Sequence, residues 1–93
     1  MKPTACIVNT ARGALIDEEA LIEALQEGRI AGAGLDVQET EPPAADNPLY
    51  DMDNVILTPH MGWRGLETRQ RLVSIAADDI KNFLAGTPVN VIV

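Results

Sequence analysis

One arginine, two carboxylates and the only histidine of this sequence have complementary chemistry. The guanidinium of Arg12 is a planar cation that can hold the carboxylate and carbonyl of a 2-oxo acid through paired hydrogen bonds. The imidazole of His60 can donate or accept a proton near neutral pH, and a carboxylate beside it, such as that of Glu41, would stabilise its protonated form. For the remaining carboxylate, Asp36, the expected role is to orient a cofactor. Together these residues suit the reduction of a carbonyl group next to a carboxylate.

Each of these residues also has a plain structural explanation. Arg12 stands beside a glycine and suits a surface turn, while Asp36 suits the cap of a turn. Glu41 precedes two prolines, where solvent would surround it, and a single loop histidine such as His60 is more often structural than functional. The chemical hypothesis therefore depends on whether the fold brings all four side chains together.

Three short apolar segments are expected to position these side chains. Residues 5–10, 30–37 and 54–58 are predicted to be strands, and a helix capped by Asp17 and stopped by Gly28 separates the first two. Alternation of strands and helices predicts an α/β fold with a parallel sheet. Ligands of such sheets bind beyond the carboxyl ends of the strands, and the candidate residues follow those ends. We therefore expect them to meet at one edge of the sheet.

The other segments are predicted to be a loop, a long helix and a tail. Residues 38–53 are rich in proline and acidic residues, which predicts a loop without a regular core element. Residues 66–85 have apolar side chains at helical spacing and stop at Gly86. The apolar tail that follows is expected to be extended. Cys6, in the first strand, is expected to be a small core residue.

Composition restricts the class of protein further. The 93 residues are 46% hydrophobic and 23% charged, which is typical of one small globular domain. The formal net charge of −7 argues against a nucleic-acid partner, which would need clustered Lys and Arg. The apolar runs are too short for a membrane span or a signal peptide, and one cysteine with one histidine makes a metal site improbable. We therefore expect no nucleic-acid, membrane or metal partner, and a cytoplasmic location.

Blocks of this sequence resemble the C-terminal part of the D-isomer-specific 2-hydroxyacid dehydrogenases, in the right order and over nearly the whole chain. They are Ile-Val-Asn-Thr-Ala-Arg-Gly at 7–13, Gly-Leu-Asp-Val at 34–37 with Glu-Pro at 41–42, and Leu-Thr-Pro-His-Met-Gly at 57–62. The closing segment at 82–91 fits too. The resemblance implies the second half of a Rossmann-type parallel-sheet dinucleotide-binding domain plus a long C-terminal helix. It also implies reversible hydride transfer between a nicotinamide cofactor and a 2-hydroxy or 2-oxo acid.

The resemblance assigns three catalytic roles. Arg12 matches the arginine that binds substrate, and His60 matches the acid/base. Glu41 matches the acidic partner of that histidine. These assignments agree with the chemistry that the residue types themselves suggest.

The resemblance also implies a nicotinamide-binding site. Asp36 matches the residue that holds the nicotinamide carboxamide, and backbone near Thr10, Ala11 and Gly62 would line the pocket together with the catalytic arginine and histidine. NAD is the expected cofactor, and NADP is not excluded, because the residue that separates them lies upstream of this segment in the family. The pair of glycines at 32–34 is expected inside a strand, so it does not form a phosphate-binding loop.

Two positions depart from the commoner family pattern. Gln38 stands where many members have an aromatic residue, which removes no catalytic group. Trp63 and Arg64 replace small residues after the histidine. Tryptophan there resembles the glycerate dehydrogenase (hydroxypyruvate reductase) branch, which makes D-glycerate and hydroxypyruvate the expected substrates. Trp63 as a packing anchor at the start of the helix is an equal alternative.

The resemblance covers only part of a complete enzyme. Residues 1–86 are expected to be the C-terminal half of the NAD-binding domain with its returning helix, and residues 87–93 an extended C-terminal tail. The upstream half-domain and the substrate domain are expected to be absent. An alternative is a catalytically inactive truncated fragment that persists as a structural or self-association module. Because an apolar helix face would lack its cover, a homodimer is expected.

Overall fold

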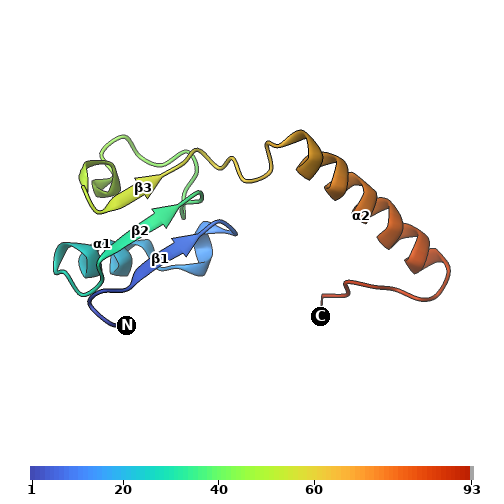
Figure 1. Ribbon diagram of the computed structural model, residues 1–93, viewed down its shortest axis with the longest axis horizontal. Helices are drawn as coiled ribbons and strands as arrows, with labels where there is room; N and C mark the ends of the chain where they lie inside the picture. The colour runs from blue at the N-terminus through green and yellow to red at the C-terminus, as the bar shows by residue number, and fades with distance from the viewer. Residues whose placement is uncertain (93) are drawn as a thin grey trace. The chain divides into compact units, whose positions relative to one another are not determined.

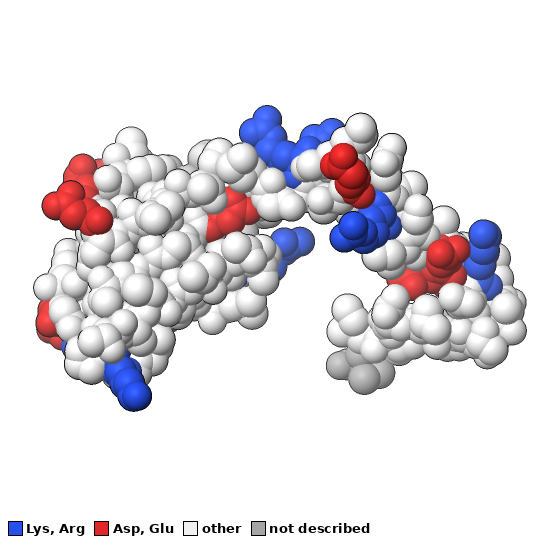
Figure 2. All heavy atoms as spheres, in the orientation of Figure 1, with Lys and Arg blue, Asp and Glu red and all other residues white. Residues whose placement is uncertain are grey.

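The computed structural model describes residues 1–92, which form two compact units. The first unit spans Met1–Gly62, and the second begins at Trp63. Acidic side chains dominate the first unit, which has 11 acidic and 3 basic residues. In Figure 2 several Lys and Arg side chains lie along the helix of the second unit.

The first unit contains a three-stranded parallel sheet, as predicted. Its strands are β1 (Cys6–Asn9), β2 (Gly32–Leu35) and β3 (Val55–Leu57), in the spatial order β1-β2-β3. Figure 1 shows all three arrows pointing the same way. The carboxyl ends of the three strands therefore lie at one edge of the sheet, and the segments that follow them can share a site.

Helix α1 (Glu18–Gln26) connects β1 to β2, and local sequence sets both of its ends. The side chain of Asp17 accepts a hydrogen bond from the Ala20 N–H at 3.0 Å, which confirms the predicted N-cap. Past the C-terminus, Gly28 adopts a φ of 67°, in the left-handed region that favours glycine. The helix is thus short, and it returns the chain to β2 beside β1.

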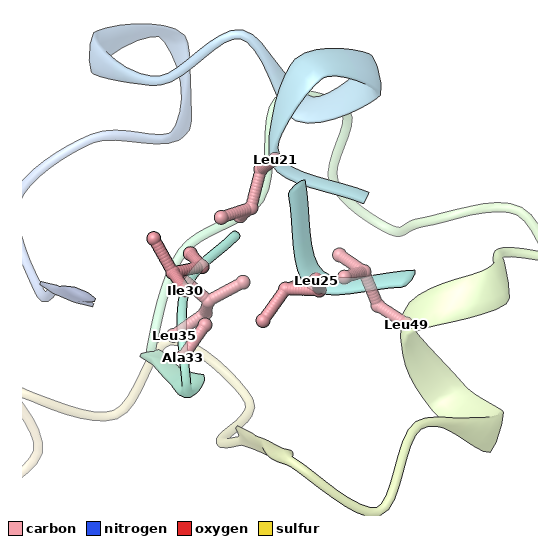
Figure 3. Close-up of a cluster of buried hydrophobic side chains, with 6 residues drawn as sticks. All are labelled: Leu21, Leu25, Ile30, Ala33, Leu35 and Leu49. Carbon is pink, nitrogen blue, oxygen red and sulfur yellow. The ribbon is translucent and has the colours of Figure 1, made fainter. Parts of the chain in front are cut away.

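One face of the sheet packs against α1 and forms the core. Figure 3 shows six buried side chains directed toward one another: Leu21, Leu25, Ile30, Ala33, Leu35 and Leu49. Leu49 comes from residues 38–53, the segment predicted to be a loop without a regular core element, and the structure corrects this prediction because the loop supplies a core side chain. A short 3-10 helix, Pro48–Asp51, presents this side chain, which is only 1% exposed. Asn47 begins that turn by accepting the Leu49 N–H at 3.0 Å.

The opposite face of the sheet carries apolar side chains that are exposed. Successive side chains of a strand point to opposite faces, so Ile7 packs against the core while Cys6 and Val8 point away from it. Val8 is 73% exposed and Ile56 72% exposed. Cys6 is exposed as well, so its prediction as a core residue is wrong.

The second unit contains helix α2 (Leu66–Leu84), close to the predicted range. Before the helix, the Trp63 ring packs against the guanidinium of Arg69, 4.5 Å from the ring centroid. After it, Gly86 has a φ of 76°, and the described residues of the tail, 87–92, form neither helix nor strand. Asn90 ties this tail to the helix by donating to Asp79 at 3.0 Å. Val93, the last residue of the predicted tail, lies outside the described residues.

Candidate active site

The predicted catalytic residues gather at the carboxyl edge of the sheet, within the first unit. Arg12 lies in the turn after β1, and His60 lies just beyond β3. Glu41 lies in the loop that follows β2. All three line one cavity of about 290 Å³, together with Gly13, Ala14 and residues 37–39. The structure thus brings together the residues that the strand-end argument selected.

Glu41 and His60 form a direct pair. Nδ1 of His60 lies 2.6 Å from Oε2 of Glu41, and because a carboxylate can only accept, the shared proton belongs to Nδ1. The other carboxylate oxygen of Glu41 accepts the Gln38 N–H at 3.0 Å, which fixes its orientation. The His60 hydrogen bond lowers the pKa of Glu41, helped by the Gln38 N–H and by the charges of His60 and Arg12. Glu41 is therefore held as a carboxylate next to the imidazole.

Asp36 holds the turn that carries His60. Its side chain is only 7% exposed and accepts three hydrogen bonds, from the Thr58 hydroxyl at 2.5 Å, the Met61 N–H at 2.9 Å and the Gly62 N–H at 2.8 Å. These donors, the Thr58 hydroxyl foremost, lower the pKa of Asp36. They stabilise a turn in which His60 adopts a φ of 50°, a conformation that side-chain-bearing residues rarely take. Asp36 thus has a structural task besides its predicted cofactor role, which stays a prediction.

Arg12 is exposed, with its guanidinium beside the backbone of its own turn. Nη1 donates to the carbonyl of Ala11 at 2.7 Å. Gly13 allows the turn to approach the loop of Glu41, because a Cβ at this position would lie 1.9 Å from the Gln38 carbonyl oxygen. No L side chain fits there without moving backbone. The close approach therefore places the Arg12 turn against the loop that carries Glu41.

The cofactor-binding predictions can be placed on the structure. A second cavity of about 200 Å³ is lined by Asp36, Thr58 and His60 with the prolines at 42, 43 and 59. It is smaller than the roughly 300–1,000 Å³ of most ligand sites, so it suits one end of a large ligand, and the Asp36 carboxylate can accept a hydrogen bond from an amide. The Gly62 N–H is already committed to Asp36. No described contact tests the predicted roles of Thr10 and Ala11.

Other kinds of site can be assessed on the described part of the chain. Among residues 1–92 there is no group of three or more His, Cys, Asp or Glu side chains that could hold a metal ion. No helix within this range has the length and apolar character needed to cross a membrane. Gly32 and Gly34 lie inside β2, where they cannot form a phosphate-binding turn.

Sequence reasoning missed Asn9, Gly13 and Thr58, which hold the site together. Asn9 is buried at the end of β1 and bonds to the backbone of the Arg12 turn. An asparagine just before a turn is a recognised signal for side-chain bonding to backbone, so Asn9 could have been found. Gly13 and Thr58 carry no comparable signal, since each acts on a segment distant in sequence.

Comparison with known proteins identifies the family. Residues 1–62 match the model of the D-isomer specific 2-hydroxyacid dehydrogenase, NAD binding domain. Over 92 residues the chain is 49% identical to a hydroxypyruvate reductase of Blautia hydrogenotrophica, covering 99% of this chain and 29% of that protein. It is 48% identical over 94 residues to a glycerate dehydrogenase of Methylorubrum extorquens, covering 99% of this chain and 30% of that protein.

Solved structures give the same result. An acyclic imino acid reductase in complex with NADPH and D-Arg matches with a TM-score of 0.77 and 44% identity, over 100% of this chain and 29% of that one. The NADPH-dependent glyoxylate/hydroxypyruvate reductase of Sinorhizobium meliloti matches with a TM-score of 0.72 and 40% identity, over 88% of this chain and 26% of that one. The chain belongs to the D-isomer-specific 2-hydroxyacid dehydrogenase family, whose NAD-binding domain it matches. It spans under a third of the length of these relatives.

Proposed function

We propose that this chain supplies the acid/base pair and the substrate-binding arginine of an enzyme that interconverts D-glycerate and hydroxypyruvate. The observation that carries the proposal is the shared cavity: Arg12, Glu41 and His60 line it together, with the imidazole and carboxylate 2.6 Å apart. A cation and a proton donor in one cavity suit a 2-oxo acid, whose carboxylate and carbonyl groups are on adjacent carbons.

In the proposed mechanism, each residue performs one task. The guanidinium of Arg12 binds the substrate carboxylate and orients the carbonyl. Protonated His60 donates to the carbonyl oxygen from Nε2, because Nδ1 bonds to Glu41. The carboxylate of Glu41 stabilises the imidazolium and fixes the ring. A nicotinamide cofactor, when bound, would supply a hydride for C2, and this hydride with the proton from His60 would convert the 2-oxo acid to the 2-hydroxy acid.

The choice of substrate rests on the relatives. The hydroxypyruvate reductase and the glycerate dehydrogenase named above match nearly the whole of this chain. The presence of Trp63 after the histidine agrees with that branch, although its contact with Arg69 also suits the role of packing anchor. Either NAD or NADP serves in this proposal, since the phosphate-binding loop falls outside these residues.

A homodimer and a cytoplasmic location are further parts of the proposal. The apolar face of α2 supports the dimer, because among the described residues its large apolar side chains are exposed. No observation on residues 1–92 favours the alternative of an inactive structural or self-association module over the enzyme. An active enzyme can also self-associate, so a dimer would not distinguish the enzyme from the inactive module.

The test uses an assembled enzyme, in which these 93 residues replace the corresponding segment of the Blautia hydroxypyruvate reductase. We expect it to reduce hydroxypyruvate with NADH or NADPH. His60→Ala should lower kcat by about a hundredfold or more, the usual effect of losing a general acid. Arg12→Lys should raise the KM for hydroxypyruvate, since lysine lacks the planar fork.

Arg29→Lys is the matched control for the arginine. Arg29 pairs with Glu23 and Glu27 on the surface, at 3.0 Å and 2.6 Å, and lines neither cavity of the site. Its variant should keep the parent KM. A folded assembled enzyme without activity, or an active His60→Ala variant, would contradict the proposed function.

A further inference from the structure

Asn9 is a buried amide that joins two parts of the candidate site. Its side chain is at the end of β1 and only 6% of the residue is exposed. Nδ2 donates to the Arg12 carbonyl at 2.8 Å, and Oδ1 accepts the Ala11 N–H at 3.1 Å. The side-chain amide therefore makes two hydrogen bonds to the backbone of the turn that carries the Arg12 side chain.

The backbone of Asn9 is fixed as well. Its carbonyl accepts the Asp36 N–H at 3.0 Å, which continues the β1–β2 pairing. Asp36 in turn holds the backbone of the His60 turn through Met61 and Gly62. A single residue thus ties the arginine turn to the segment that positions the histidine.

We propose that Asn9 is a positioning residue for Arg12, placing the guanidinium where it holds the substrate carboxylate. The inference rests on the proposed function and deepens it. Loss of the amide frees the carbonyl of Arg12 and the N–H of Ala11 from their side-chain partners. Gly13, the next residue, touches the Gln38 backbone, so movement of this turn changes the distance from Arg12 to the Glu41–His60 pair.

A purely structural role for Asn9 makes a different prediction, and Asn47 provides the comparison. Asn47 also uses both ends of its amide, accepting the Leu49 N–H at 3.0 Å and donating to Glu18 at 2.7 Å. It begins the short helix that presents a core residue and lines neither cavity of the site. Asn47→Ala should therefore destabilise the fold without moving Arg12.

The experiment measures kcat/KM and KM in the assembled enzyme. Asn9→Ala should raise the KM for hydroxypyruvate about tenfold, while the KM for the nicotinamide cofactor stays near that of the parent. Asn47→Ala should leave both KM values unchanged, even if it lowers the melting temperature equally. Asn9→Asp keeps the acceptor for Ala11 but cannot donate to the Arg12 carbonyl, so it should resemble Asn9→Ala.

A double-mutant cycle with Arg12→Ala decides the question. If Asn9 acts through Arg12, the Asn9→Ala substitution should change kcat/KM less than twofold once Arg12 is already alanine. Fully additive effects, or an equal rise in KM for Asn47→Ala, would overturn the inference. Asn9→Ser, which keeps a small polar side chain, replaces alanine in the cycle if the alanine variant does not fold. An inactive parent enzyme would instead contradict the proposed function, so the two failures are distinct.

Discussion

The apolar side chains of the two helices differ in how deeply they are buried. In the first unit, Leu21 and Leu25 of α1 are 6% and 4% exposed, because they pack on the sheet. In the second unit, Leu72, Ile80 and Phe83 of α2 are 60%, 62% and 71% exposed. Both helices have the same kind of apolar periodicity, so the pattern in the sequence predicts a buried face without saying what buries it.

The two helices are stabilised in different ways. Helix α1 has only 9 residues and would be marginal alone, so the sheet and its cap stabilise it. Helix α2 has 19 residues and no side-chain cap at its start. Its apolar side chains find no core within their own unit, whereas the residues of the candidate site all belong to the unit with a core.

The largest expected effect is on the stability of the first unit. Leu49→Ala should lower the free energy of unfolding of the 93-residue chain by about 2–5 kcal/mol, because it opens a cavity where the side chain is 1% exposed. Denaturant unfolding followed by circular dichroism measures this change.

Phe83→Ala is the matched control for the second unit. It removes a larger side chain that is 71% exposed, so under conditions where the chain is monomeric it should cost well under 1 kcal/mol. A cost for Phe83→Ala equal to that for Leu49→Ala would show that both units have a core, and the contrast between them would fail.

The burial pattern also explains which elements could be predicted. The predicted strand at 30–37 is longer than β2 because Ile30 and Val37 are buried but lie outside the strand. Apolar periodicity reports burial, whereas a strand is defined by backbone pairing. Leu49 was missed for a related reason: proline and acidic neighbours mark a loop, yet a short turn within it points one side chain into the core.

A smaller effect is expected on self-association through α2. Leu72 and Ile80 are eight positions apart and share a helix face, so Leu72→Glu with Ile80→Glu would place charges in a dimer interface. Burial of one such side chain contributes roughly 1.5–3 kcal/mol, so the double variant should be monomeric at concentrations where the parent is a dimer. Light scattering after size exclusion gives the mass.

Ser74→Glu adds a negative charge to the polar face of α2 and should leave the association unchanged. A parent chain of about 10 kDa at high micromolar concentration would contradict the dimer. That outcome would also show that exposed apolar side chains on α2 do not drive association under these conditions.

The part of the candidate site that lies at the strand ends could be predicted from the sequence. Arg12, Asp36 and His60 each follow a strand, and parallel pairing brings those ends to one edge. The pairing of Glu41 with His60 was expected from family resemblance and is seen as a 2.6 Å contact. Gly13 escaped prediction because its task appears only when two loops distant in sequence pack together, whereas Asn9 bonds to its near neighbours Ala11 and Arg12 and could have been found.

The finest test of the site concerns the charge of Glu41. A hydrogen bond from His60 lowers the pKa of Glu41, so Glu41 carries its negative charge beside the imidazole. Asp36 also interacts with the His60 charge, and Arg12 interacts with the Glu41 charge. Glu41 is therefore one of several charged groups that act on the Glu41–His60 pair. Removing the negative charge next to the imidazole should disfavour the protonated form of the ring in the variant.

The sign of the expected change follows from which form of His60 reacts. Reduction of a 2-oxo acid needs protonated His60, so in Glu41→Gln the fall in kcat with rising pH should occur at lower pH than in the parent. Oxidation of the 2-hydroxy acid needs neutral His60, so its rise in kcat should move to lower pH too. Glu19→Gln removes the same charge at an exposed position of α1 that lines neither cavity of the site, so it should leave both profiles in place. Profiles of the assembled enzyme that move in opposite directions, or that move equally in both variants, would show that Glu41 is not the partner of His60 during catalysis.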